Sequence, residues 1–175
     1  MAKTYTTPTS VSAGDAITAS LYNTYVGTNV ANLIVPPTFM VARSTSQTGY
    51  TGNSAITWNQ TSWDSDGMVS GAIVTVRTAG IYLLTFNGVL DATATITDVT
   101  PVIKLNGTDL FDEHKEPFSA TVMSFTTSIV ANLAVNDLLT AAVQVIGGSA
   151  YSIRGSATTD TSQTRLSGVW IGRTS

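Results

Sequence analysis

The chain has 175 residues, a net charge of −3 and no cysteine, which excludes disulfide bonds and thiolate zinc sites. Charged residues make up only 11% of it, against about a quarter in an average soluble domain, so we expect copies of the chain to cover part of its surface. It has no basic run, no signal-peptide core and no stretch near the roughly 20 apolar residues of a membrane helix, so we expect neither nucleic acid nor a membrane as partner.

The first 34 residues predict an arm followed by one helix. Residues 1–14 are polar and read as an extended arm or a frayed terminus. Between Ile17 and Ile34 apolar residues recur at steps of three and four, which predicts a helix with one apolar stripe. Thr18 is placed to cap this helix, and Pro36-Pro37 ends it. The stripe consists of Leu21, Tyr22, Tyr25, Val26, Val30, Leu33 and Ile34.

From Thr38 onward the apolar pattern has a period of two, which predicts β-strands. Short strands separated by frequent turn residues favour a sandwich or a barrel. Asn106-Gly107 is a strong hairpin signal, because both central residues of a type I′ turn need a positive φ. The strands are expected at 39–43, 55–59, 71–76, 81–90, 101–105, 121–133, 138–145, 151–155 and 165–171.

The segment Ile81–Leu90 is apolar on both of its faces. Tyr82, Leu84 and Phe86 point to one side, while Ile81, Leu83 and Val89 point to the other. A sheet with one wet face would alternate cleanly, so this strand is expected to be buried twice. We interpret its second face as the interface of a homotrimer; the alternative is that the N-terminal helix covers it.

The order of motifs from residue 71 to 172 resembles the C1q and tumour-necrosis-factor family of trimeric jelly rolls. The matching motifs are Gly80-Ile81-Tyr82 before a long apolar strand, the Asn106-Gly107 turn, a leucine-containing turn closing on Asn136-Asp137, and Ser167-Gly168-Val169-Trp170-Ile171 near the end. The resemblance implies an all-β, C1q/TNF-like jelly-roll sandwich, preceded here by the arm and the helix. It also implies a homotrimer.

A second resemblance lies in the N-terminal segment. Residues 12–23, Ser-Ala-Gly-Asp-Ala-Ile-Thr-Ala-Ser-Leu-Tyr-Asn, are similar to the opening of many tailed-bacteriophage virion proteins, in which a helix and then a β domain follow. Together the two resemblances imply a phage structural protein. We therefore divide the chain into a docking segment at 1–37 and a jelly-roll head at 38–175. The expected virion-docking residues are Leu21, Tyr22, Tyr25, Val26 and Leu33.

Few residues suggest chemistry, and we expect no enzyme and no cofactor. His114, the only histidine, lies in a charged run that reads as a loop rather than a metal site, and no nucleophile motif accompanies it. The segment Asp64–Gly67 reads as a turn, with a calcium loop as the alternative. Trp58 and Trp170 are expected to be buried on strands. Tyr50 and Trp63 are the candidates for an exposed contact.

Two functions are compatible with these patterns. The first is a capsid decoration or cement trimer, or a short head fibre, that docks on another virion protein through its N-terminal segment. The second is a tail-associated receptor-binding tip that recognises a host surface sugar or protein with the same head. The short chain favours the first, since receptor-binding fibres usually need a long shaft.

Overall fold

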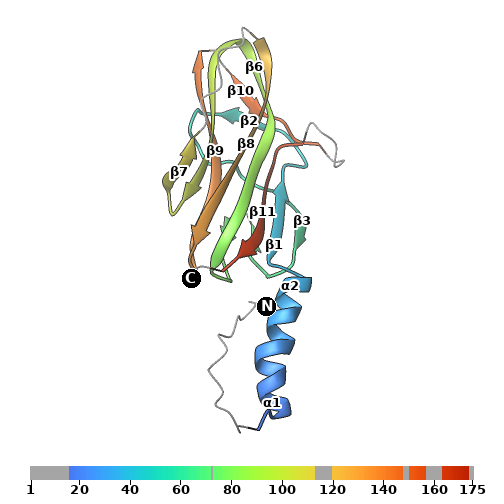
Figure 1. Cartoon of the computed structure of the whole chain (residues 1–175). Coiled ribbons are helices and arrows are strands. Elements are labelled where there is room, and N and C mark those ends of the chain that lie inside the picture. The colour runs from blue at the N-terminus through green and yellow to red at the C-terminus, as the bar shows by residue number, and fades with distance from the viewer. Residues whose placement is uncertain (1–15, 72, 113–119, 148–149, 157–162, 174–175) are drawn as a thin grey trace.

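The structure is a computed structural model that describes residues 16–71, 73–112, 120–147, 150–156 and 163–173. It consists of a β-sandwich with a helix projecting from one end (Figure 1). Within these described residues no helix is long and apolar enough to cross a membrane.

The N-terminal helix runs from Ala19 to Ile34 in three parts. These are α1 (Ala19–Tyr22), a π-helical turn η1 (Asn23–Gly27) and α2 (Thr28–Ile34). The predicted cap is confirmed, because the Thr18 hydroxyl oxygen accepts a hydrogen bond from the Leu21 N–H at 3.2 Å. The wide π turn ends at Gly27, a residue with low intrinsic preference for the α-helix.

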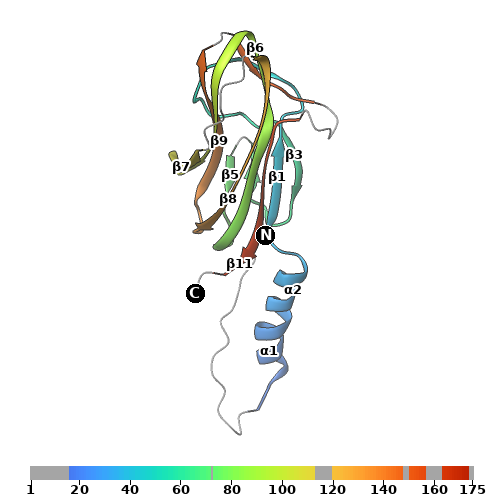
Figure 2. The same ribbon diagram turned by 45° about the horizontal axis from the view of Figure 1, so that its top comes forward.

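The helix extends beyond the sandwich and lies on neither of its sheets (Figures 1 and 2). Most of its apolar side chains are exposed as a result. The alternative that this helix covers the strand after Gly80 is therefore wrong.

Eleven strands form the sandwich in the described residues. They are β1 (Thr38–Ala42), β2 (Gln47–Tyr50), β3 (Gln60–Asp64), β4 (Val69–Ser70), β5 (Ile73–Thr75), β6 (Gly80–Leu105), β7 (Thr108–Asp112), β8 (Ala120–Leu133), β9 (Leu138–Gly147), β10 (Tyr151–Ile153) and β11 (Arg165–Gly172).

Strand β6 belongs to both sheets. Its first half pairs with β11 and β8, and with β1 and β3 beyond β11 these strands form the front sheet. Its second half pairs with β9 and β7, and with β5 and β4 beyond β9 these form the back sheet. Figure 1 shows β6 rising from the helix end, turning at the far end and returning. One strand of 26 residues thus joins the two layers.

The predicted strand at 55–59 is wrong, although its alternation has a physical cause. Ile56 and Trp58 point into the core, but the segment makes only the isolated bridge Ala55–Ala142. The Ile56 N–H donates to the Ala141 carbonyl at 2.8 Å. Alternating burial therefore occurs here without a ladder. The neighbouring strands β2 and β3 and the hairpin strand β7 have no separate counterpart in the prediction.

The turn at Asn106-Gly107 has the predicted positive φ angles, 52° and 82°. It joins β6 to β7 as an antiparallel hairpin. The two motif glycines Gly80 and Gly168 have a different role, which is close packing. A Cβ on Gly168 would lie 2.3 Å from the Phe39 ring, and one on Gly80 would lie 2.0 Å from the Trp170 indole nitrogen. Any side chain there would force the strands apart.

A buried chain of hydrogen bonds joins the base of the sandwich to the core. The Tyr82 hydroxyl donates to the Thr78 carbonyl at 2.7 Å, and the Thr78 hydroxyl donates to the Asp66 carboxylate at 2.8 Å. Burial, together with the nearby charge of Asp66, raises the pKa of Tyr82 well above its usual value. The neutral phenol is therefore the form built into the fold.

Replacing Tyr82 by Ala should lower the free energy of unfolding by roughly 3–5 kcal/mol, as for other large aromatic side chains removed from a core. Tyr82→Phe keeps the ring and loses only the hydrogen bond to Thr78, so it should cost about 1 kcal/mol. Denaturant titration of both variants separates the contribution of the ring to the free energy of unfolding from that of the hydroxyl. Equal losses in the two variants would contradict the assignment of most of this stability to ring burial.

A chain that starts at Pro37 should fold, because the sandwich contains its own core and the helix contributes no residue to the main cluster of buried apolar side chains. We expect the truncated protein to keep a β-type circular dichroism spectrum and a cooperative thermal transition. Aggregation or loss of the transition would show that the helix is needed for the core.

Candidate functional site: the front face and the projecting helix

The outer face of the front sheet is apolar in the half next to the helix. In the register of the sheet, Thr38, Val169, Leu83 and Val130 form one row across β1, β11, β6 and β8. Leu83 and Val130 are exposed on this row. We define the apolar patch as this row with its exposed or half-buried neighbours: Trp63, Ile81, Leu83, Val130, Val169 and Ile171.

A shallow hollow lies between Trp63 and Leu83, where the apolar patch borders the polar residues Thr85 and Ser167. Thr38, Phe39 and Val169 also line it. Trp63 is 53% exposed, so a large aromatic side chain stands at the rim of an apolar depression. Such a surface suits a complementary protein surface better than a small charged ligand.

Away from the helix the same face becomes polar. The next row pairs Ser167 with Thr85 and Thr85 with Ser128, and the two hydroxyls of Thr85 and Ser128 are hydrogen-bonded at 3.0 Å. The row after that holds Arg165, Asn87 and Thr126. The front face is thus divided along its length, with its largest apolar area at the helix end and the exposed Val122 at the far end.

The three predicted interface residues on β6 differ in exposure. Leu83 is 38% exposed and Ile81 is half-buried, so both reach the outer face. Val89 has the same parity but is only 5% exposed within a single chain, so its prediction as a surface contact is wrong. Residues near the chain end lie against this part of β6: the Val89 N–H donates to the Thr164 hydroxyl, and the Val89 carbonyl accepts from the Arg154 N–H.

The prediction that Tyr50 is an exposed contact is also wrong. Its side chain is 4% exposed. The Tyr50 hydroxyl donates to the Ser54 carbonyl at 2.6 Å and accepts from the Val143 N–H at 2.8 Å. Burial raises the pKa of Tyr50 to about 12. The residue joins the segment after β2 to strand β9.

The expected burial of the two other tryptophans agrees with the structure, although Trp58 lies outside any strand. Trp58 and Trp170 are buried in the core, where Trp58 meets Phe86 edge-on at 6.4 Å between ring centroids. Trp63 is exposed, as predicted, and lies on β3.

The segment Asp64–Gly67 is a tight turn built around its own carboxylates. The Asp64 carboxylate accepts hydrogen bonds from the backbone N–H groups of Asp66, Met68 and Val69 at 2.8–3.3 Å. Asp66 is buried and accepts from Thr78. These oxygens are used within the protein, and the arrangement favours the turn over the calcium loop. His114 lies outside the described residues, within which no three His, Cys, Asp or Glu side chains gather as a metal site would require.

The predicted docking residues lie on the projecting helix. Tyr22, Val26 and Leu33 are exposed, whereas Leu21 and Tyr25 are half-buried. Val30 and Ile34, which belong to the same stripe, are exposed as well. The sequence pattern therefore located a surface that the sandwich leaves uncovered.

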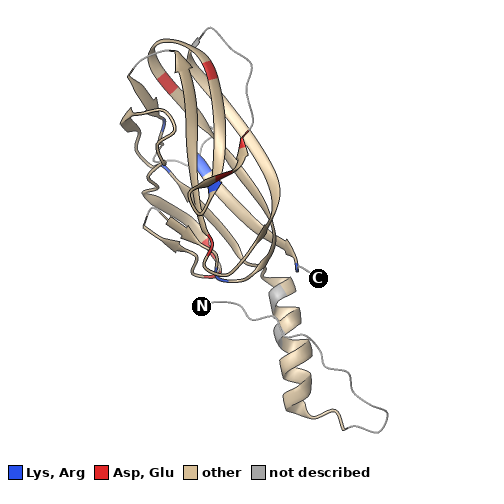
Figure 3. Cartoon of the chain, turned by 90° about the vertical axis from the view of Figure 1, so that its left-hand side faces the viewer, with Lys and Arg blue, Asp and Glu red and all other residues tan. Residues whose placement is uncertain are grey.

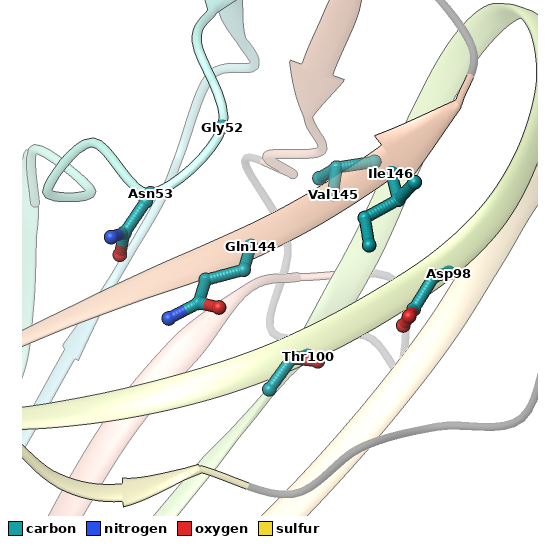
Figure 4. A pocket seen from close by; sticks show the side chains of 7 residues that line it. All are labelled: Gly52, Asn53, Asp98, Thr100, Gln144, Val145 and Ile146. Atoms are coloured by element: carbon teal, nitrogen blue, oxygen red, sulfur yellow. The ribbon is translucent and has the colours of Figure 1, made fainter.

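A second hollow, which sequence reasoning missed, lies on the back sheet (Figure 4). Asp98 and Thr100 of β6 and Gln144 of β9 line it, and Asn53 approaches from the segment after β2. The Gln144 amide donates to the Asp109 carboxylate at 3.3 Å, and Lys104 pairs with Asp109 at 3.5 Å. One carboxylate, two amides and one hydroxyl can hydrogen-bond an uncharged polar ligand. No sequence pattern predicted this hollow, because the residues that line it are far apart in the chain.

The fold can be compared with known proteins. No protein-family model matches the chain, and no curated protein matches it. Among solved structures, the globular domain of zebrafish complement 1qA protein is similar with a TM-score of 0.54 at 12% identity, over 79% of this chain and 99% of that one. Murine APRIL at pH 8.0 is similar with a TM-score of 0.56 at 18% identity, over 77% and 98%. The sandwich therefore has the C1q/TNF-like jelly-roll fold.

Proposed function

We propose that the protein is a homotrimeric structural component of a phage particle, either a capsid decoration or cement protein or a short head fibre. The observation that carries this proposal is the uncovered helix, which leaves the head at the same end as the apolar patch. The head displays one surface suited to its own copies, and the helix presents another suited to attachment. No step of the proposal requires catalysis.

The trimer is supported by the distribution of apolar and polar residues on the front face. In a cyclic trimer each interface pairs two different surfaces of neighbouring copies. The apolar patch supplies one such surface, and its hollow beside Trp63 gives it shape. A charged fraction of 11% leaves little like-charge repulsion between copies.

The trimer predicts the effect of charges placed in the patch. Leu83→Asp combined with Val169→Asp should convert the trimer to monomers at micromolar concentration, because two carboxylates would be buried without partners. Sedimentation equilibrium measures the mass. Leu138→Asp is the matched control, since Leu138 is exposed to a similar degree, 42% against 38% for Leu83, but lies on β9. A wild-type protein that sediments as a monomer would refute the trimer.

Attachment to a particle is supported by the N-terminal sequence pattern and by the exposure of the helix. An isolated helix of this length is marginal in water. Its stripe therefore needs a surface to cover it, and the head does not provide one. The segment 1–37 is the part of the chain that we assign to the virion side.

Removing residues 1–34 should abolish incorporation into phage particles while the head still forms trimers. Leu21→Asp combined with Tyr25→Asp should reduce incorporation nearly as much, because both side chains lie on the helix outside the sandwich core. Quantitative mass spectrometry of purified particles gives the copy number. Normal incorporation of the truncated protein would show that the head makes the docking contact instead.

The second candidate function is a receptor-binding tip, and the polar hollow on the back sheet favours it. Asn53, Gln144 and Thr100 could hydrogen-bond the hydroxyls of a host sugar, which is a ligand without charge. The same particles separate the two functions. A capsid protein would be present in many copies, and its loss would lower the heat resistance of the particle. A tip would be present in few copies, and its loss would abolish adsorption.

A further inference from the structure

Four apolar side chains form an uncovered stripe on the helix. Tyr22, Val26, Val30 and Leu33 recur at steps of four, four and three and are exposed, Leu33 by 67%. We call these four residues the helix stripe. Side chains spaced in this way lie along one face of a helix. A helix face with four apolar side chains is normally buried against another protein element.

The absence of charged residues on the helix limits the kinds of partner that can cover the helix stripe. No Asp, Glu, Lys or Arg occurs between Ala16 and Ala42, and in Figure 3 the ribbon of the described helix has no blue or red residue. A partner that binds through charged residues would find no oppositely charged residue on this helix. Identical copies of the helix, in contrast, meet without like-charge repulsion, and each brings the same apolar face.

The position of the helix brings such copies together. Thr38, which lines the hollow beside Trp63, lies four positions after Ile34. A stretch of four residues spans at most about 14 Å. In a cyclic trimer whose apolar patches lie beside the symmetry axis, the three helices begin beside that axis as well. The helix Ala19–Ile34, at about 1.5 Å per residue, then projects roughly 24 Å beyond the end of the head.

We infer that the helices of three copies pack against one another as a parallel bundle, with the helix stripe at its centre. The inference rests on the proposed homotrimer and names the occupant of the helix stripe as the same stripe in two further copies. Cyclic symmetry makes the three helices parallel. Of the five predicted docking residues, Tyr22, Val26 and Leu33 then lie inside the bundle. Leu21 and Tyr25 lie to one side of the helix stripe, so these two remain for the contact with the virion.

Disulfide trapping tests this arrangement, because the chain has no cysteine of its own. Val26→Cys places one thiol in the helix stripe of the full-length protein with little change in size. Mild oxidation at low protein concentration should link two of every three chains into disulfide-bonded dimers, since the third thiol has no second thiol to pair with. A non-reducing gel shows these dimers. Leu33→Cys should behave in the same way.

Ala31→Cys is the matched control, since Ala31 is exposed on the same helix but lies on the side opposite to Leu33. It should give few dimers, and fewer on dilution. Sedimentation of the reduced variants distinguishes the two proposals. A trimer whose Val26→Cys variant forms no dimers, or no more than the Ala31→Cys variant, would overturn the bundle and leave the homotrimer standing. A monomer without dimers would overturn both.

Discussion

The contact between Trp170 and Gly80 determines how the front sheet is assembled. The absence of a Cβ at residue 80 lets the indole lie against the backbone, where its N–H reaches the Ala79 carbonyl at 3.3 Å. This contact accompanies the register that pairs Trp170 with Tyr82 and Gly168 with Leu84. A slip of one residue would exchange the two faces of the strand. The outward position of Leu83 and Val169, and with it the apolar patch, depends on this register.

The same end of the molecule holds the hydrogen bonds from Tyr82 through Thr78 to Asp66. They connect the turn after β3 to the start of β6, the strand shared by both sheets. The carboxylates of the turn, which could have served a metal ion, are instead hydrogen-bonded within the fold. The polar groups of this turn are therefore hydrogen-bonded within the fold. What this end of the molecule leaves uncovered includes the apolar side chains of the patch and the helix.

The helix with its Thr18 cap and the Asn106-Gly107 hairpin could be predicted because local chemistry determines each of them. The alternation predicted a sandwich or a barrel, and the resemblance to the C1q/TNF family implied the jelly roll. Burial in three dimensions was harder to predict. The alternation at 55–59 reflects side chains that point into the core, but the backbone of this segment forms no strand ladder. On β6, Leu83 and Val89 have the same parity, yet Leu83 is exposed and Val89 is buried. Tyr50 follows a glycine and precedes a turn, yet its partner Val143 lies 93 residues away. Such distant contacts leave no local pattern.

The point at which the helix joins the head affects how the protein bears a mechanical load. The helix leads into β1, which pairs antiparallel with β11 on one side and β3 on the other. A pull along the helix would act on β1 nearly along its length, so the hydrogen bonds of both ladders would be loaded together rather than opened one after another. If the helix is the attachment to a particle, the head is held by the interior of its front sheet. Thermal agitation or shear of the particle would then load two antiparallel ladders of the front sheet first.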